Sequence, residues 1–200
     1  MTQHLEHNTY ILEHIESSIR VKQLILDNVE LIEKIDQAAK LCVDALTSGN
    51  KIILAGNGGS AADAQHIAAE FVSKLRFDRP ALASISLATD TSMLTAIGND
   101  YGYEKVFSRQ LLANGNQGDI FIAISTSGNS ENVIDAVKES KNIGITSIGF
   151  LGETGGNLKK IVEHDICVPS SETATIQECH IMIGHIICRY TEDLLFLDNN

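Results

Sequence analysis

The sequence of 200 residues has no hydrophobic run of the length that a membrane-spanning helix needs, which is about 20 apolar residues. Its first ten residues, MTQHLEHNTY, are polar and carry no basic flank before an apolar segment, so no secretory signal is visible. Basic residues are scarce, since 15 Lys and Arg face 26 Asp and Glu and the net charge is −11. Nucleic-acid binding needs concentrated positive charge. We therefore expect a cytoplasmic protein that binds neither nucleic acid nor a membrane, although backbone amides can still hold a phosphorylated metabolite.

Several sequence motifs are also missing. The cysteines at 42, 167, 179 and 188 form no CxxC pair, which favours buried reduced thiols over zinc or disulfide use. The stretch 56–60, Gly-Asn-Gly-Gly-Ser, is not the dinucleotide fingerprint, because GxGxxG would need Gly where Ala61 stands. No Lys-Ser/Thr pair follows it, so it is not a Walker loop either.

The composition, with 44% apolar and 20% charged residues, is that of a globular protein, and 200 residues suffice for one domain. Apolar residues recur at helical spacing over 4–24 and again over 27–48. Two amphipathic helices ahead of the first strand cannot both be buried on one small sheet. We expect residues 1–200 to form a single domain, in which the helical pair of residues 1–48 packs on itself and on another subunit of a homo-oligomer.

From residue 51 the chain alternates short apolar runs with helical patterns. The runs predict strands at 51–56, 82–87, 119–124, 145–151 and 164–169. The remaining stretches predict helices at 60–75, 90–98, 103–114, 130–143, 157–162 and 174–197. Near-continuous apolar strands separated by helices are typical of a parallel sheet covered on both faces. The prediction is an α/β fold with a doubly wound, five-stranded parallel sheet in flavodoxin-like order, with ligands at the carboxyl ends of its strands.

Polar loops follow the expected strands. The loop Ser125-Thr126-Ser127-Gly128-Asn129-Ser130 is the most informative, because its four hydroxyls at a helix start exceed what capping requires and suit a phosphate. It contains no lysine, which suits a phosphate held as a handle better than one being transferred. The glycine turn after the first strand is either a tight connection or a binding site. Asp90 or Thr91 is expected to cap a helix, and 98–102 to form a loop between helices.

Candidate acid/base or metal-binding residues lie on two helices. His66 and Glu70 are four residues apart and share a helix face, and the last helix carries Gln177, His180 and His185. Each residue alone is read as a core or solvent-facing side chain, but together beside phosphate-type loops they suggest an acid/base or metal site. Gln177 and His185 lie about 12 Å apart along an ideal helix, so their convergence on one ion would need long side chains or a frayed helix start.

Four motifs, GNGGSAADAQHIAAE, AIGNDYGYEKVFSRQL, ISTSGNSENV and IQECHIMIGH, resemble the sugar isomerase (SIS) domain family over nearly the whole chain. The resemblance implies a homotetramer with active sites near subunit interfaces. It also implies an aldose–ketose isomerase that converts sedoheptulose 7-phosphate to D-glycero-D-manno-heptose 7-phosphate, for lipopolysaccharide or other surface glycans.

The resemblance further implies roles for individual residues. Substrate contacts are expected from Asn57, Gly58, Gly59, Glu70, Asn99, Asp100, Ser125, Thr126, Ser127, Ser130 and Gln177. One zinc ion per subunit is expected on His66, Glu70, Gln177 and His185. Glu70 and His185 are the expected catalytic pair, which moves protons through an enediol(ate).

Two other functions use the same fold. Some relatives are non-catalytic binding proteins that regulate the initiation of replication, and these lack groups at the positions of Glu70 and His185. The other alternative is a different isomerisation or an ether cleavage on a sugar phosphate. The presence of Glu70 and His185 favours an isomerase over the first alternative, and the N-terminal helices together with the predicted zinc ligands argue against the second.

Overall fold

A computed structural model describes the backbone of residues 2–197 and the side chains from Thr9 to Leu197, so Met1 and residues 198–200 of the expected domain lie outside the described range. The α-helices are α1 Thr2–Leu26, α2 Val29–Thr47, α3 Gly59–Val72, α4 Thr91–Tyr101, α5 Ser108–Asn114, α6 Glu131–Asn142 and α7 Thr173–Phe196. The strands are β1 Ile52–Gly56, β2 Ser84–Ser86, β3 Ile120–Ser125, β4 Thr146–Leu151 and β5 His164–Cys167. Short 3-10 helices span Tyr103–Lys105 (η1) and Leu158–Lys160 (η2).

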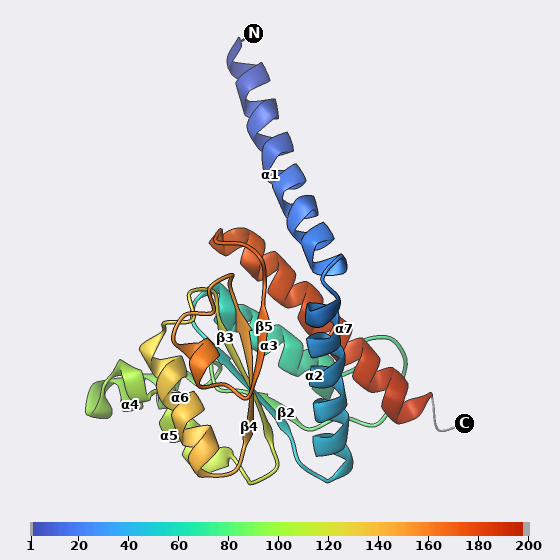
Figure 1. The fold of residues 1–200 in the computed structure, drawn as a ribbon. Coiled ribbons are helices and arrows are strands. Elements are labelled where there is room, and N and C mark those ends of the chain that lie inside the picture. Colours follow the sequence, from blue (N-terminus) through green and yellow to red (C-terminus); the bar gives the residue numbers. More distant parts are fainter. Residues whose placement is uncertain (1, 198–200) are drawn as a thin grey trace.

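The five strands form one parallel sheet in the order β2-β1-β3-β4-β5, which confirms the predicted flavodoxin-like order. Successive side chains of a strand point to opposite faces. Ile52 and Leu54 therefore join a core with α2, α3 and α7, whereas Ile53 and Ala55 join a second core with α5 and α6. Figure 1 shows the sheet between these two groups of helices. Burial on both faces explains why the strands are continuous apolar runs.

Some element boundaries differ from the prediction. Residues 98–101, expected in a loop, form the last turn of α4, and the helix ends where Gly102 adopts a φ of 97°. That left-handed conformation is readily open to glycine only. The helix expected over 103–114 is instead divided into η1 and α5. Asp90 caps α4 as expected, since its side chain accepts a hydrogen bond from Met93 N at 2.8 Å.

The two N-terminal helices do not lie side by side. Asn28 caps α2 by accepting a hydrogen bond from Leu31 N at 3.0 Å, and α1 runs on beyond this joint and projects from the body (Figure 1). The expectation that the helices pack on each other is wrong for most of α1, because the chain does not reverse at residues 27–28. Val21 and Ile25 are buried, whereas several apolar side chains further out are exposed: Tyr10, Ile11, Leu12, Ile15 and Ile19. Within the described range, no helix is long and apolar enough to cross a membrane.

Candidate active site

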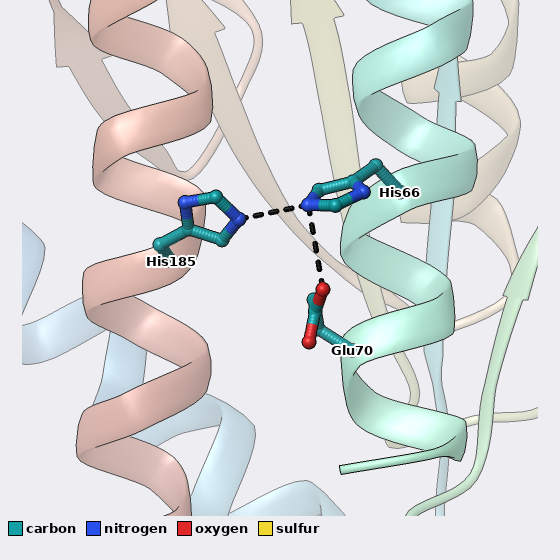
Figure 2. Close-up of side chains that lie close together, drawn as sticks. All are labelled: His66, Glu70 and His185. Atoms are coloured by element: carbon teal, nitrogen blue, oxygen red, sulfur yellow. Dashed lines mark hydrogen bonds and ion pairs between the residues drawn. The ribbon is translucent and has the colours of Figure 1, made fainter. Parts of the chain in front are cut away.

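Three of the predicted ligands converge between α3 and α7. His66 Nε2 lies 2.8 Å from His185 Nε2 and 3.4 Å from Glu70 Oε1. Figure 2 shows the two side chains of α3 and the one of α7 pointing toward one another. One donor atom from each residue lies within 4.8 Å of the others, which is an arrangement that could hold a metal ion. These three residues are called the triad below.

The approach of the two helices depends on a glycine next to the triad. A Cβ atom on Gly184 would lie 2.5 Å from Ile67 Cδ1, so a larger residue here would force the buried Ile67 side chain or α7 itself to move. His66 and Glu70 lie on one face of α3 because four residues make about one helical turn. The short spacing of the helices therefore brings His185 within reach of both.

A separate pocket of about 290 Å³ lies at the carboxyl ends of the strands. It is lined by the amino-terminal residues of α3, α6 and α7 and by the end of β3: Asn57, Gly58, Gly59, Ser60, Ile124, Ser125, Thr126, Ser130, Thr173 and Gln177. Helix amino termini present unpaired N–H groups and the positive end of the helix dipole. Three of them around one pocket create a site for an anion such as a phosphate.

The loop 125–130 is held in shape by bonds within itself and by a second loop. Ser125 Oγ accepts a hydrogen bond from Gly128 N at 3.1 Å and lies 3.1 Å from Ser130 Oγ. Gly128 has a φ of 65°, and a Cβ atom there would lie 2.1 Å from Gly155 O. Leu158 N donates to Gly128 O at 3.0 Å. The segment 152–158 therefore supports the phosphate-type loop from behind, a role that the sequence analysis did not assign to it.

Gln177 lies at this pocket and not within the triad. Its side-chain amide covers Gly59, where a Cβ atom would lie 2.4 Å from Gln177 Nε2. Gly59 precedes His66 by seven residues, or about 10 Å along α3. The structure thus brings together His66, Glu70 and His185 and places Gln177 about two helical turns away.

Asn99 and Asp100 lie on the outer surface of the last turn of α4, and they bond to each other through Asn99 Nδ2 and Asp100 Oδ1 at 2.8 Å. Figure 1 shows α4 on the side of α5 and α6, away from α7. Neither residue lines the pocket in this single chain. Ser127 is exposed and also does not line it.

One member of the triad, His185, also lines a second, largely apolar hollow. This groove, of about 580 Å³, is lined by Leu75, Arg76, Ile181, Met182, His185, Ile186 and Arg189. Ile181 and His185 share the α7 face that carries Gln177, because the three residues are spaced by four. One face of α7 therefore borders both the phosphate-type pocket and the groove.

A buried ion pair holds the end of α3. Arg79 Nε donates to Glu192 Oε1 at 2.8 Å, and the two side chains are 2% and 0% exposed. The guanidinium also donates to the carbonyl oxygens of Glu70 at 2.8 Å and Phe71 at 2.7 Å, which the helix end leaves without helical partners. Glu192 in turn accepts a hydrogen bond from Leu75 N at 2.9 Å. The pair fixes the turn of α3 from which the Glu70 side chain leaves.

Two further ionisable groups are shifted by burial. Burial raises the pKa of Asp63, one turn before His66, to about 6, and its Oδ2 has no hydrogen-bond partner among the described residues. Burial lowers the pKa of His180 to about 4, despite a contact of 3.1 Å between its Nε2 and Leu151 O. His180 is therefore neutral at physiological pH, and it connects α7 to the end of β4, next to the loop 125–130.

Sequence reasoning missed some residues around the pocket. Thr173 lines it, and Asn132 and Tyr103 contact Asn57 behind it. The only signal for Thr173 was its place at the start of the last helix. Asn132 comes two residues after the loop 125–130, where the first turn of a helix is expected. Nothing in the sequence connects it with Asn57.

Residues 19–152 match the SIS domain family, which defines the class of protein. Over 189 residues the chain is 59% identical to the phosphoheptose isomerase of Aneurinibacillus thermoaerophilus, with 94% of this chain and 96% of that protein covered. It is 56% identical to the phosphoheptose isomerase of Sulfurimonas denitrificans, with 94% and 97% covered. The chain belongs to the SIS domain family and, within it, to the phosphoheptose isomerases.

Solved structures agree with this assignment. The phosphoheptose isomerase of Neisseria gonorrhoeae superposes with a TM-score of 0.87 at 43% identity, covering 93% of this chain and 98% of that one. The Francisella tularensis phosphoheptose isomerase gives a TM-score of 0.89 at 35% identity, with 94% and 98% covered. The family and the fold predicted from the motifs are therefore confirmed.

Proposed function

We propose that this chain interconverts sedoheptulose 7-phosphate and D-glycero-D-manno-heptose 7-phosphate. The observation that carries the proposal is the convergence of His66, Glu70 and His185 beside a pocket surrounded by three helix amino termini. An aldose–ketose isomerase needs groups that exchange protons with adjacent carbons and a separate grip on the phosphate. The two features supply these two needs.

The pocket binds the phosphate in this proposal. Ser125, Thr126 and Ser130 line it and present hydroxyls, and the first turns of α3 and α6 add backbone N–H groups. Ser130 begins α6 without a side-chain capping bond, so beside its contact with Ser125 Oγ its hydroxyl keeps bonding capacity for a ligand. Ser127, at the exposed corner of the loop, would join them when substrate binds. The sugar contacts the remaining lining groups that the family motifs implicate, which are Asn57, Gly58, Gly59 and Gln177.

Glu70 and His185 carry the proton transfers. One of the two removes a proton from C1 of the ketose, which gives an enediol(ate), and a proton is then delivered to C2 while the O1 and O2 protons are exchanged. The Glu70 side chain is 19% exposed, so its carboxylate is accessible to a bound ligand. The backbone of Glu70 is fixed by Arg79, so its carboxylate starts from a defined position.

The triad also fits a zinc ion. Imidazole nitrogen and carboxylate oxygen are common zinc ligands, and three protein ligands with an open fourth position are typical of catalytic zinc. His66, Glu70 and His185 would hold the ion, and Gln177 would need to extend toward it from its place over Gly59. A zinc ion at this position would polarise the carbonyl and stabilise the charge of the enediolate.

The protein acts as a cytoplasmic homotetramer in this proposal, and its product serves heptose synthesis for lipopolysaccharide or another surface glycan. The exposed apolar side chains of α1 support an oligomer, because a row of this kind is ordinarily covered by a partner. The exposed position of α4 suggests that Asn99 and Asp100 complete the active site of a neighbouring subunit.

The decisive experiment measures formation of heptose 7-phosphate from sedoheptulose 7-phosphate, with and without a chelator. Wild-type protein is expected to turn over, and Glu70→Gln and His185→Ala are expected to be inactive but folded. Glu33→Gln, an exposed glutamate of α2, is the matched control and should keep full activity. Absence of turnover by the wild-type protein overturns the proposed reaction, and near-normal turnover by Glu70→Gln or His185→Ala overturns the role of that residue.

A further inference from the structure

A pair of asparagine side chains joins the loop after β1 to the first turn of α6, next to the phosphate-type pocket. Asn57 Nδ2 donates to Asn132 Oδ1 at 2.8 Å, and Asn132 Nδ2 donates back to Asn57 Oδ1 at 2.9 Å. Asn57 follows β1, whereas Asn132 lies in the first turn of α6 and is 2% exposed. A polar side chain this deeply buried needs hydrogen-bond partners, and Asn57 supplies both of them.

A third residue completes the hydrogen bonding of the Asn57 oxygen. The hydroxyl of Tyr103 in η1 donates to Asn57 Oδ1 at 3.1 Å. An amide oxygen has two lone pairs and an amide nitrogen has two hydrogens. Asn132 and Tyr103 together occupy both lone pairs, and Asn132 accepts one of the two hydrogens. Asn57 is left with one N–H donor and no free acceptor.

We propose that Asn132, assisted by Tyr103, is a positioning residue that fixes the amide of Asn57 so that it offers the substrate a single N–H donor. The inference rests on the proposed function, because it takes Asn57 to contact the sugar phosphate. A fixed donor selects an acceptor oxygen of the ligand. Without Asn132 the amide can rotate and present its own oxygen, which repels an acceptor on the substrate.

A double-mutant cycle tests this inference, because a residue that acts through another has no effect once that other residue is gone. Asn132→Leu and Asn57→Ala are each expected to lower kcat/KM by about 100-fold, the size of effect that a small misplacement at an active site produces. The double variant is expected to be no worse than Asn57→Ala. Losses that multiply in the double variant overturn the inference. Asn142→Leu, the same change at an exposed site of α6, is the matched control and should match the wild-type protein.

A milder cycle covers the case in which Asn132→Leu does not fold. Tyr103 is 62% exposed, so Tyr103→Phe removes one hydrogen bond and little packing. It is expected to lower kcat/KM by about fivefold, within the range of one hydrogen bond, and to have no effect in the Asn57→Ala background. An equal loss in both backgrounds overturns the inference.

A binding readout separates this inference from the proposed reaction. The dissociation constants of sedoheptulose 7-phosphate and of inorganic phosphate are measured for each folded variant of the two cycles. Only the sugar phosphate should bind more weakly, and non-additively, because the loop 125–130 is unchanged. If the wild-type protein binds the sugar phosphate but does not convert it, the proposed reaction is overturned. The double-mutant cycle can then still be measured on the dissociation constants. Additive losses in binding, or no binding at all, overturn the inference.

Discussion

The Nε2 atoms of His66 and His185 lie 2.8 Å apart, although the two residues are 119 positions apart in the sequence. At this distance the two nitrogens either share one hydrogen or serve one metal ion, because two bare lone pairs or two N–H groups would repel each other. The carboxylate of Glu70, 3.4 Å from His66 Nε2, adds a negative charge that favours a cation between them. The geometry of the pair therefore leads directly to a test with metal.

Protein stripped with a chelator and titrated with zinc is expected to bind about one ion per chain through the triad. His66→Asn and His185→Asn are expected to lose this binding, because each removes a nitrogen ligand. Calorimetry and metal analysis measure the stoichiometry. Zinc should raise the Tm of the wild-type protein but not of variants whose folded state no longer binds it. His164→Asn, in β5, is the control. Unchanged zinc binding by His66→Asn would show that the ion sits elsewhere.

Gly59→Ala is expected to weaken substrate binding without unfolding the protein. The new Cβ would lie 2.4 Å from Gln177 Nε2, so the flexible glutamine side chain must leave its place at the pocket. Losing one hydrogen bond to substrate corresponds to roughly a tenfold rise in KM. Gly98→Ala is the control, since its Cβ would meet nothing closer than 3.8 Å. A KM equal to that of the wild-type protein would mean that Gln177 does not contact the substrate.

The buried pair Arg79–Glu192 should matter far more to stability than the neighbouring pair Arg76–Asp193. Arg79→Met leaves the fully buried Glu192 carboxylate without its cation, which costs about 3–5 kcal/mol. Arg76→Met removes the contacts of Arg76 Nη1 with the two carboxylate oxygens of Asp193, at 2.7 and 2.9 Å. These side chains are 38% and 30% exposed, so the loss costs about 0–1 kcal/mol. Urea unfolding at one fixed protein concentration measures both variants. Equal costs would contradict the structural account of Arg79.

Local patterns in the sequence were enough to predict the sheet. The run Ile52–Ala55 is buried on both faces, so its continuous apolar character predicted a central strand correctly. The extent of α4 was not predictable, because Gly98 and the polar Asn99-Asp100 pair are typical of a turn and none of the helix's residues is buried. There the end of the helix is set by the backbone conformation of Gly102.

The candidate site was predictable only in part. The spacing of His66 and Glu70 predicted that they share a helix face, and the structure brings them together. No local pattern connects them to His185, whose position depends on how α3 and α7 pack. The residue types on the last helix made His185 a candidate, and the family resemblance gave it a role. The support of the loop 125–130 by Gly155 is a contact between backbones, and such contacts leave no side-chain pattern to read.

Stability should fall as the pH falls from about 6.5 to 4 because of His180. Burial lowers the pKa of this side chain from its ordinary value near 6.5 to about 4, so in this range the unfolded chain takes up a proton that the folded chain does not. The loss approaches about 3 kcal/mol at the acid end. Burial raises the pKa of Asp63 to about 6, which favours the folded state in the same range, so the Asp63→Asn background is used. His180→Gln should weaken the dependence of the free energy of unfolding, measured with urea, on pH between about 6.5 and 4. If the free energy still falls as steeply with pH, His180 is not the source of the loss.

Subunits carrying different inactivating changes should restore activity to each other if α4 serves a neighbouring active site. Asn99 and Asp100 do not line the pocket of their own chain, whereas Glu70 and His185 come together within one chain. Asp100→Ala is expected to be inactive in this case. Co-refolded with Glu70→Gln in equal amounts, it should regain about a quarter of wild-type activity, because random mixing combines an intact triad with an intact α4 of the neighbouring subunit in that share of the sites.

The control for this exchange is a mixture of Glu70→Gln with His185→Ala. Both changes fall in the triad of a single chain, so no combination of these subunits rebuilds an intact triad and the mixture should stay inactive. Light scattering must show that every variant and mixture has the same oligomeric state as the wild-type protein. If the Asp100→Ala mixture also stays inactive, although its subunits exchange, α4 does not complete a neighbouring site. Recovery in the control mixture would instead show that Glu70 and His185 act in different sites.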